Sequence, residues 1–79
     1  MNNSDKEILT IEDCKQLELY WHSFNNGDYE YKVDGFWHLI RDGKDLLKGI
    51  KATWCYSYKN GDYEYEVDDQ YVRLNKNDN

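Results

Sequence analysis

The chain has 79 residues, with sixteen acidic against ten basic side chains and a formal net charge of −6. This balance excludes direct binding to nucleic-acid phosphates and docking on anionic membranes, because both need clustered Lys and Arg. It favours a basic protein as the partner. Thirteen aromatic residues argue against disorder and predict a small core that is rich in Tyr and Trp.

The first structural signal along the chain is at Thr10–Asp13, which has the form of a capping box at the start of a helix. Two interpretations of residues 10–23 remain open: one helix throughout, or a short helix that ends near Gln16 and is followed by a strand. We favour the second. No basic start and no apolar stretch of a signal peptide precedes this segment, so a cytoplasmic location is expected.

An internal duplication is the strongest signal in the sequence. Residues 24–34, FNNGDYEYKVD, recur as residues 58–68, YKNGDYEYEVD, with eight of eleven positions identical at an offset of 34. Two copies are too few for a solenoid of independent repeats. We therefore predict a single domain over residues 1–79, with pseudo-repeats at 17–41 and 51–74 and a disordered tail at 75–79.

Each copy predicts a β-hairpin, because Asn-Gly between alternating segments is typical of a two-residue type I′ turn. With the second turn centred on Asn60 and Gly61, Tyr58 lies opposite Tyr63. In this register the aromatic side chains share one face and the acids share the other, as in a half-buried antiparallel pair.

A third strand is predicted after each hairpin, over residues 36–41 and 70–74. Residues 42–49 join the two halves, with one short helical turn around Leu46 and Leu47. The predicted fold class is all-β or β-rich α+β, with about six antiparallel strands from an internal duplication of a three-stranded meander and a short N-terminal helix. The aromatic faces of the two meanders are expected to meet, in a sandwich or a partly closed barrel.

The first candidate binding surface is acidic. Carboxylates occupy alternate positions along the second copy, which places them on one face of a strand, and the first copy repeats much of the pattern. The predicted partner-binding acids are Asp62, Glu64, Glu66 and Asp68, together with Asp28, Glu30 and Asp34. Such a face could pair with Lys and Arg of a nucleic-acid-binding protein, and a solvated face that prevents edge aggregation is the alternative.

The second candidate surface consists of Trp21 and Trp37. The predicted register places Lys32 between the two indoles, which is a cation–π arrangement. If this row is exposed, it is a binding anchor, since Trp dominates interface energetics. If the N-terminal segment covers it, it is a core patch.

No catalytic, metal or cofactor site is predicted. The register places His22 and His38 on either side of Tyr31, but neither Cys14 nor Cys55 lies beside them, and the spacing of a zinc site is missing. Both cysteines are expected to be free thiols. A chain of this length has little room for a catalytic cleft.

These observations predict a small acidic inhibitor that binds and occludes a basic target, a nucleic-acid-binding enzyme or a defence complex. By analogy of size and charge, it is of the phage or mobile-element counter-defence type (anti-CRISPR or anti-restriction). The alternatives are a non-catalytic ligand- or carbohydrate-binding module with a Trp/Tyr platform, and a structural homo-oligomeric subunit. A homodimer is expected if one face is uncovered, namely the face of Leu19, Trp21, Trp37 and Leu39.

Overall fold

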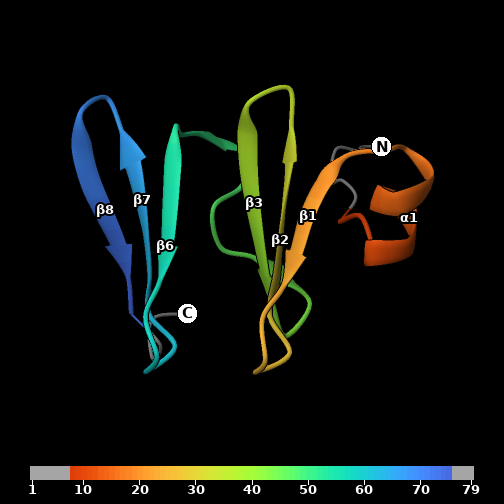
Figure 1. Ribbon diagram of the computed structural model, residues 1–79, viewed down its shortest axis with the longest axis horizontal. Coiled ribbons are helices and arrows are strands. Elements are labelled where there is room, and N and C mark those ends of the chain that lie inside the picture. Colours follow the sequence, from red (N-terminus) through yellow and green to blue (C-terminus); the bar gives the residue numbers. More distant parts are fainter. Residues whose placement is uncertain (1–7, 76–79) are drawn as a thin grey trace.

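The structure is a computed structural model and describes residues 8–75. These residues form one short helix and eight strands in two antiparallel sheets, so the predicted β-rich class is confirmed, with two more strands than expected (Figure 1). Residues 76–79 of the predicted tail lie outside the described residues. The elements are α1 (Ile11–Gln16), β1 (Tyr20–Ser23), β2 (Tyr29–Val33), β3 (Phe36–Arg41), β4 (Lys44–Asp45), β5 (Ile50–Lys51), β6 (Trp54–Ser57), β7 (Tyr63–Val67) and β8 (Gln70–Leu74).

Helix α1 begins with the capping box that the sequence predicts. The hydroxyl of Thr10 accepts a hydrogen bond from the backbone of Asp13 at 3.1 Å, and the Asp13 carboxylate accepts one from the backbone of Thr10 at 3.0 Å. The helix ends at Gln16, and a positive φ of 59° at Glu18 turns the chain toward β1. The expectation of a short helix followed by a strand is confirmed, and a helix over all of residues 10–23 is wrong.

Sheet A contains the meander β1-β2-β3, with β4 and β5 each paired to β3. The turn between β2 and β3 has positive φ at both Asp34 and Gly35, the signature of type I′, and β3 has the predicted bounds. The helical turn expected around Leu46 and Leu47 is wrong. Instead, a second turn with two positive φ values, at residues 42–43, sends β4 back along β3.

Both Asn-Gly hairpins differ from the predicted register by one residue. The backbone N–H of Tyr58 donates to the carbonyl of Asp62, which leaves a three-residue loop at 59–61. Within this loop Gly61 alone has positive φ, 96°, whereas a type I′ turn needs positive φ at two residues. The first hairpin closes in the same way, over residues 24–28. A shift of one residue moves every side chain of these pairings to the other face.

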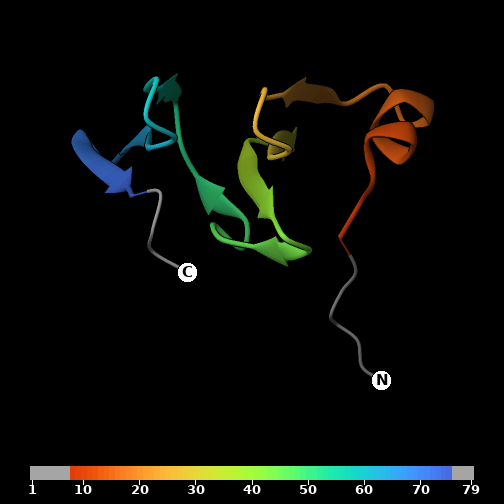
Figure 2. The ribbon, with the colours of Figure 1, turned by 90° about the horizontal axis from the view of Figure 1, so that it is seen from below.

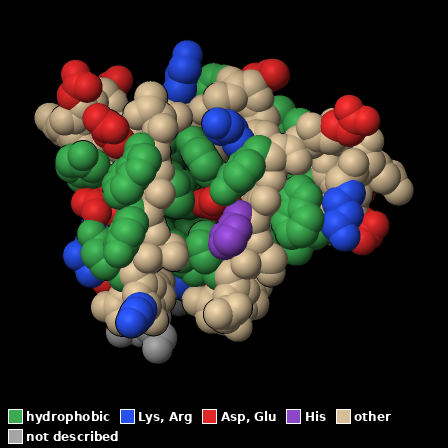
Figure 3. Space-filling model, viewed as in Figure 1, with side chains coloured by type: hydrophobic (Ala, Val, Ile, Leu, Met, Phe, Trp, Pro, Cys, Tyr) green, Lys and Arg blue, Asp and Glu red, His purple; other side chains and the backbone are tan. Residues whose placement is uncertain are grey.

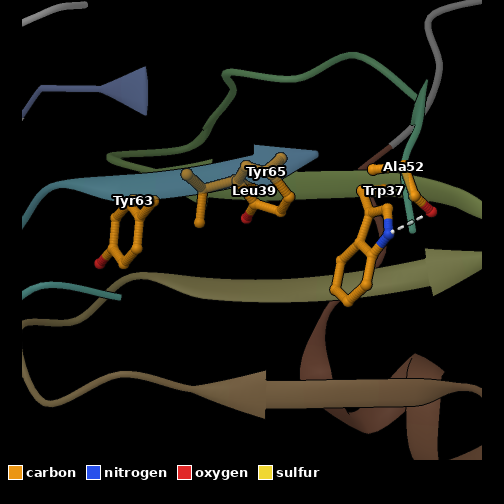
Figure 4. Packing of buried hydrophobic residues seen from close by; sticks show 5 residues of the cluster. All are labelled: Trp37, Leu39, Ala52, Tyr63 and Tyr65. Carbon is orange, nitrogen blue, oxygen red and sulfur yellow. Dashed lines mark hydrogen bonds between the residues drawn. The ribbon is translucent and has the colours of Figure 1, made fainter. Parts of the chain in front are cut away.

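Sheet A lies between α1 on one side and sheet B, formed by β6-β7-β8, on the other (Figures 1 and 2). The two meanders pack with unlike faces in contact, not through equivalent faces as expected. The core between the sheets consists of Trp37, Leu39, Ala52, Tyr63 and Tyr65 (Figure 4). A second cluster, formed by Cys14, Tyr31 and Ile40, packs between sheet A and α1.

Candidate functional site

Two of the predicted partner-binding acids, Asp28 and Glu30, point into the interface between the sheets and are buried. Asp28 accepts hydrogen bonds from the hydroxyl of Tyr63 at 2.7 Å and from Nη2 of Arg41 at 2.6 Å. Glu30 accepts one from the hydroxyl of Tyr65 at 3.1 Å. Because the two bonds from the tyrosines cross from one repeat to the other, both acids hold the repeats together and face the interior of the protein.

The hydrogen bonds at this interface alter the acidity of the groups that make them. Burial raises the pKa of Asp28, but the hydrogen bonds from Arg41 and Tyr63 outweigh it and leave the pKa below its ordinary value. Burial, and then the hydrogen bond to Asp28, raises the pKa of Tyr63 to about 12. Both groups therefore keep the protonation states that the interface needs at neutral pH.

Neither cysteine is activated as a nucleophile. The thiol of Cys55 lies 3.1 Å from a carboxylate oxygen of Glu30, and burial, followed by this negative charge, raises its pKa to about 12. Burial, and then the charge of Asp13, raises the pKa of Cys14. Both groups are thiols at neutral pH, whereas a cysteine nucleophile acts as the thiolate. Among the described residues, no group of three His, Cys, Asp or Glu side chains is placed to hold a metal ion.

The predicted row of Trp21, Lys32 and Trp37 is wrong in its first member. Tyr20, not Trp21, pairs with Lys32, whose ammonium lies 5.1 Å from the centre of the Trp37 ring. Trp37 is buried between the sheets, and its indole N–H donates to the carbonyl of Ala52 (Figure 4). Trp21 lies on the opposite face of sheet A and packs toward α1, so the two indoles form no common platform.

The dimer face expected from Leu19, Trp21, Trp37 and Leu39 is likewise divided between two covered layers. Trp37 and Leu39 belong to the core between the sheets, while Leu19 and Trp21 pack in the cluster at α1. The structure therefore gives no uncovered face at these four positions on which a homodimer could form.

The prediction that His22 and His38 flank Tyr31 holds for His38 alone. Its ring stacks on Tyr31, with 4.7 Å between the ring centres, and its Nδ1 lies 2.6 Å from the carboxylate of Asp45. His22 pairs with Glu30 on the other face of sheet A. The two histidines are thus separated by the sheet and share no ligand site.

The largest exposed aromatic group lies on the face of sheet B that points away from sheet A, which we call the outer face of sheet B. Its cross-strand rows are Trp54–Glu66–Tyr71 and Tyr56–Glu64–Arg73. Trp54 is 43 % exposed and Tyr71 is 62 % exposed. The rings of Trp54 and Tyr56 are within 16° of parallel, and Tyr71 packs edge-on against Trp54. Figure 3 shows hydrophobic side chains gathered on this side of the molecule, with acidic side chains among them.

The four acids predicted to share one strand face in the second copy lie in three different environments. Asp62 is buried and forms an ion pair with Arg73, with a shortest distance of 2.8 Å. Glu64 and Glu66 lie on the outer face, where they accept hydrogen bonds from the hydroxyls of Tyr58 and Thr53. The last acid of each copy, Asp68 and Asp34, is exposed in a turn.

A hollow of about 450 Å³ lies between the ends of the two Asn-Gly hairpins. Among residues 8–75, its lining includes His22, Asn26, Ser57 and Lys59, and no carboxylate or thiol. Ligand sites of this volume are mostly lined by apolar groups with a few polar groups that converge on the ligand. The hollow is large enough for a small polar molecule, to which these side chains could donate hydrogen bonds.

No protein-family model, no curated protein and no solved structure matches this chain. Within the described residues, no helix has the length and apolar character needed to cross a membrane. The structure alone thus defines the class, a β-rich protein of two stacked, duplicated meanders with one exposed aromatic and acidic sheet face.

Proposed function

We propose that the chain is a non-catalytic, acidic protein-binding module whose recognition surface is the outer face of sheet B. The observation that carries this proposal is the contiguous group of Trp54, Tyr56 and Tyr71, all exposed, beside the carboxylates of Glu64 and Glu66. Tyr and Trp are enriched at the centres of protein interfaces, where they supply most of the binding energy.

The charge of the chain supports a basic partner. Residues 53–75 contain five acidic and two basic side chains, and the whole chain carries −6. Acids beside aromatic anchors give electrostatic steering and specificity for a positively charged surface. The role we propose for this binding is occlusion of a basic, nucleic-acid-handling protein, of the phage or mobile-element counter-defence type.

The test is affinity capture from a lysate of candidate host cells, washed at low and then at high salt, with captured proteins identified by mass spectrometry. Trp54→Ala should reduce capture of the specific partner at least about tenfold, as expected for a hot-spot Trp. Phe36→Ala is the matched control, because Phe36 is also 43 % exposed but lies on sheet A. Release of the partner by salt supports a basic target, whereas equal capture by both variants contradicts the proposed surface.

A carbohydrate-binding platform is the second candidate function. Its rings are Trp54 and Tyr56, because Trp21 and Trp37 lie on opposite faces of sheet A. The exposed rings of Trp54 and Tyr56 are nearly parallel, with 5.8 Å between centres, which suits stacking against the C–H face of a sugar. Glu64 and Glu66 lie beside them and could accept hydrogen bonds from sugar hydroxyls. Sugar-dependent changes in the NMR signal of the Trp54 indole, insensitive to salt, would favour this candidate.

A further inference from the structure

The outer face of sheet B repeats the face of sheet A that packs against sheet B, which we call the inner face of sheet A. The register of the strands is the same in both repeats, so whole cross-strand rows correspond at the offset of 34. The rows Tyr20–Lys32–Trp37 and His22–Glu30–Leu39 of sheet A correspond to Trp54–Glu66–Tyr71 and Tyr56–Glu64–Arg73 of sheet B.

The inner face of sheet A already has an occupant, the two tyrosines at alternate positions of β7. Asp28 accepts a hydrogen bond from Tyr63, and Glu30 accepts one from Tyr65. The ring of Trp37 packs against Tyr65, with 5.6 Å between centres. This face thus binds a strand that presents Tyr-x-Tyr, through two acids that are themselves two residues apart.

We propose that the outer face of sheet B binds the same feature on a partner protein, an antiparallel sheet that presents two tyrosines at alternate positions of one strand. Asp62 and Glu64 stand where Asp28 and Glu30 stand in the first repeat, and they receive the two hydroxyls. Glu64 accepts one beside the hydroxyl of Tyr58, as Glu30 accepts from Tyr20 and Tyr65 at once. The side chain of Asp62, although largely buried, keeps 10 % of its surface exposed for the other. The ion pair of Asp62 with an arginine is compatible with this role, because Asp28 accepts from Arg41 and from a tyrosine at once. This inference rests on the proposed function and names the contact surface of the partner.

Two differences between the faces refine the chemistry of the partner. Glu66 stands where sheet A carries Lys32, and Arg73 stands where sheet A carries the buried Leu39. The outer face is therefore more acidic near Trp54 and less apolar at its centre. A basic residue beside the two tyrosines of the partner complements Glu66.

A second copy of this chain presents three Tyr-x-Tyr pairs, at residues 29–31, 56–58 and 63–65, and in none of them are both tyrosines unbound. In the pair at residues 56–58, the hydroxyl of Tyr58 already donates to Glu64 of its own chain. The hydroxyl of Tyr29 donates to the carbonyl of Leu9 at 2.6 Å, and that of Tyr31 accepts from the N–H of the same residue at 3.1 Å. The pair at residues 63–65 lies in the core between the sheets. The occupant is therefore a different protein.

The experiment fuses the proposed Tyr-x-Tyr strand to residues 1–75 of the chain, which holds it at a high local concentration. A copy of residues 42–75 is appended after Asn75, in phase with the period of 34, and carries Thr53→Ser as a mass label for its Trp54 peptide. Hydroxyl-radical footprinting with mass spectrometry then measures the reactivity of the original Trp54. A control fusion carries Tyr63→Ser and Tyr65→Ser in the appended copy only.

In the fusion with intact tyrosines, the reactivity of the original Trp54 should fall toward that of the buried Trp37, and in the control fusion it should not. Equal reactivity in the two fusions would overturn the inference. If capture of a partner depends on Trp54 while the fusion gives no protection, this inference fails and the proposed function stands. If the fusion protects Trp54 but no captured protein depends on Trp54, the proposed function is contradicted, while the inference that the two faces bind the same feature is supported.

Discussion

Tyr65 and Glu30, 35 residues apart in the chain, are joined by a hydrogen bond of 3.1 Å across the interface between the two sheets. Both side chains are buried, and Glu30 also accepts from the hydroxyl of Tyr20 and the thiol of Cys55. A buried carboxylate is costly unless its oxygens are hydrogen-bonded, so these donors make the burial of Glu30 tolerable. They also restrict the sheets to one relative position, since a slipped interface would leave the carboxylate unsatisfied.

Removal of the Tyr65 hydroxyl tests this bond. Tyr65→Phe keeps the ring in the core but takes one donor from a buried carboxylate, so the free energy of unfolding should fall by about 1–3 kcal/mol. Tyr71→Phe, at a residue that is 62 % exposed, should change it by less than about 0.5 kcal/mol. Urea denaturation of both variants measures the difference, and equal effects would show that the bond does not stabilise the stacking.

The buried carboxylate of Asp28 at the same interface predicts that the free energy of unfolding depends on pH. The pKa of Asp28 is lower in the folded chain than its ordinary value, so its charge contributes stability that is complete above a pH of about 3.9 and is lost as the pH falls through the folded pKa. Asp28→Asn removes this contribution. The difference in unfolding free energy between the wild type and Asp28→Asn should be largest near neutral pH and shrink in acid. A difference that stays constant with pH would contradict the role of the Asp28 charge.

Asp45 organises the connection between the two repeats. One carboxylate oxygen accepts from the backbone N–H groups of Leu39, Leu47 and Lys48, and the other lies 2.6 Å from His38. Asp45→Ala leaves these groups without their acceptor and should cost about 1–3 kcal/mol, with faster hydrogen exchange over residues 44–51. Asp45→Asn retains a carbonyl oxygen for the backbone donors and should cost clearly less. Equal losses for the two variants would argue against this role of the backbone bonds.

Two glycines separate the cost of backbone strain from the cost of crowding. Gly27 has a φ of +97° and open space around an added Cβ, so Gly27→Ala should cost about 1–2 kcal/mol through the backbone alone. At Gly49, with a φ of +80°, an added Cβ would also lie 3.3 Å from Cε1 of His38. Gly49→Ala should therefore cost more, and a His38→Ala background should recover only the excess. Thermal unfolding of Gly27→Ala, Gly49→Ala, His38→Ala and the Gly49→Ala/His38→Ala double variant measures both contributions. An equal cost of Gly49→Ala in both backgrounds would argue against crowding by His38.

Much of the fold follows from local signals in the sequence. The capping box at Thr10 sets the start of α1, and the duplication predicts that two equivalent meanders form. The third strand of the first repeat begins where it is predicted, because the Asp34–Gly35 turn before it has two positive φ values, as type I′ requires. These features depend on a few neighbouring residues, so no knowledge of the tertiary structure is needed to find them.

The register of the Asn-Gly hairpins could not be settled by the pattern of side chains. Aromatic residues occur on both faces of β1, whereas those of β6, Trp54 and Tyr56, lie on the face opposite to Tyr63 and Tyr65 of β7. Either register therefore gives each sheet an aromatic face that could be buried. The missed signal is the aspartate after each Asn-Gly, whose backbone N–H donates to the asparagine side chain two residues earlier, at 3.0 Å in both hairpins. This Asx contact is typical of a turn that keeps the asparagine at negative φ.

The one-residue shift in the hairpin register accounts for most errors among the predicted binding residues. The seven predicted acids include two that are buried between the sheets, and the predicted register places the aromatic side chains of β6 on the core face, although Trp54 is 43 % exposed. The error follows from the period of two in a strand, which exchanges the faces when the register moves by one residue. Burial of Asp28 and Glu30 depends on tyrosines 35 residues away, and no local pattern indicates such contacts.

The two repeats stack with unlike faces in contact and leave the outer face of sheet B uncovered. Hydroxyl-radical footprinting of the wild-type chain tests this stacking directly, because it compares residues of the same type. Trp54 should react much faster than Trp37, and Tyr71 much faster than Tyr63 and Tyr65, in line with their exposure. Protection of Trp54 together with rapid oxidation of Tyr65 would place the opposite face of sheet B in solvent and contradict this stacking of the repeats.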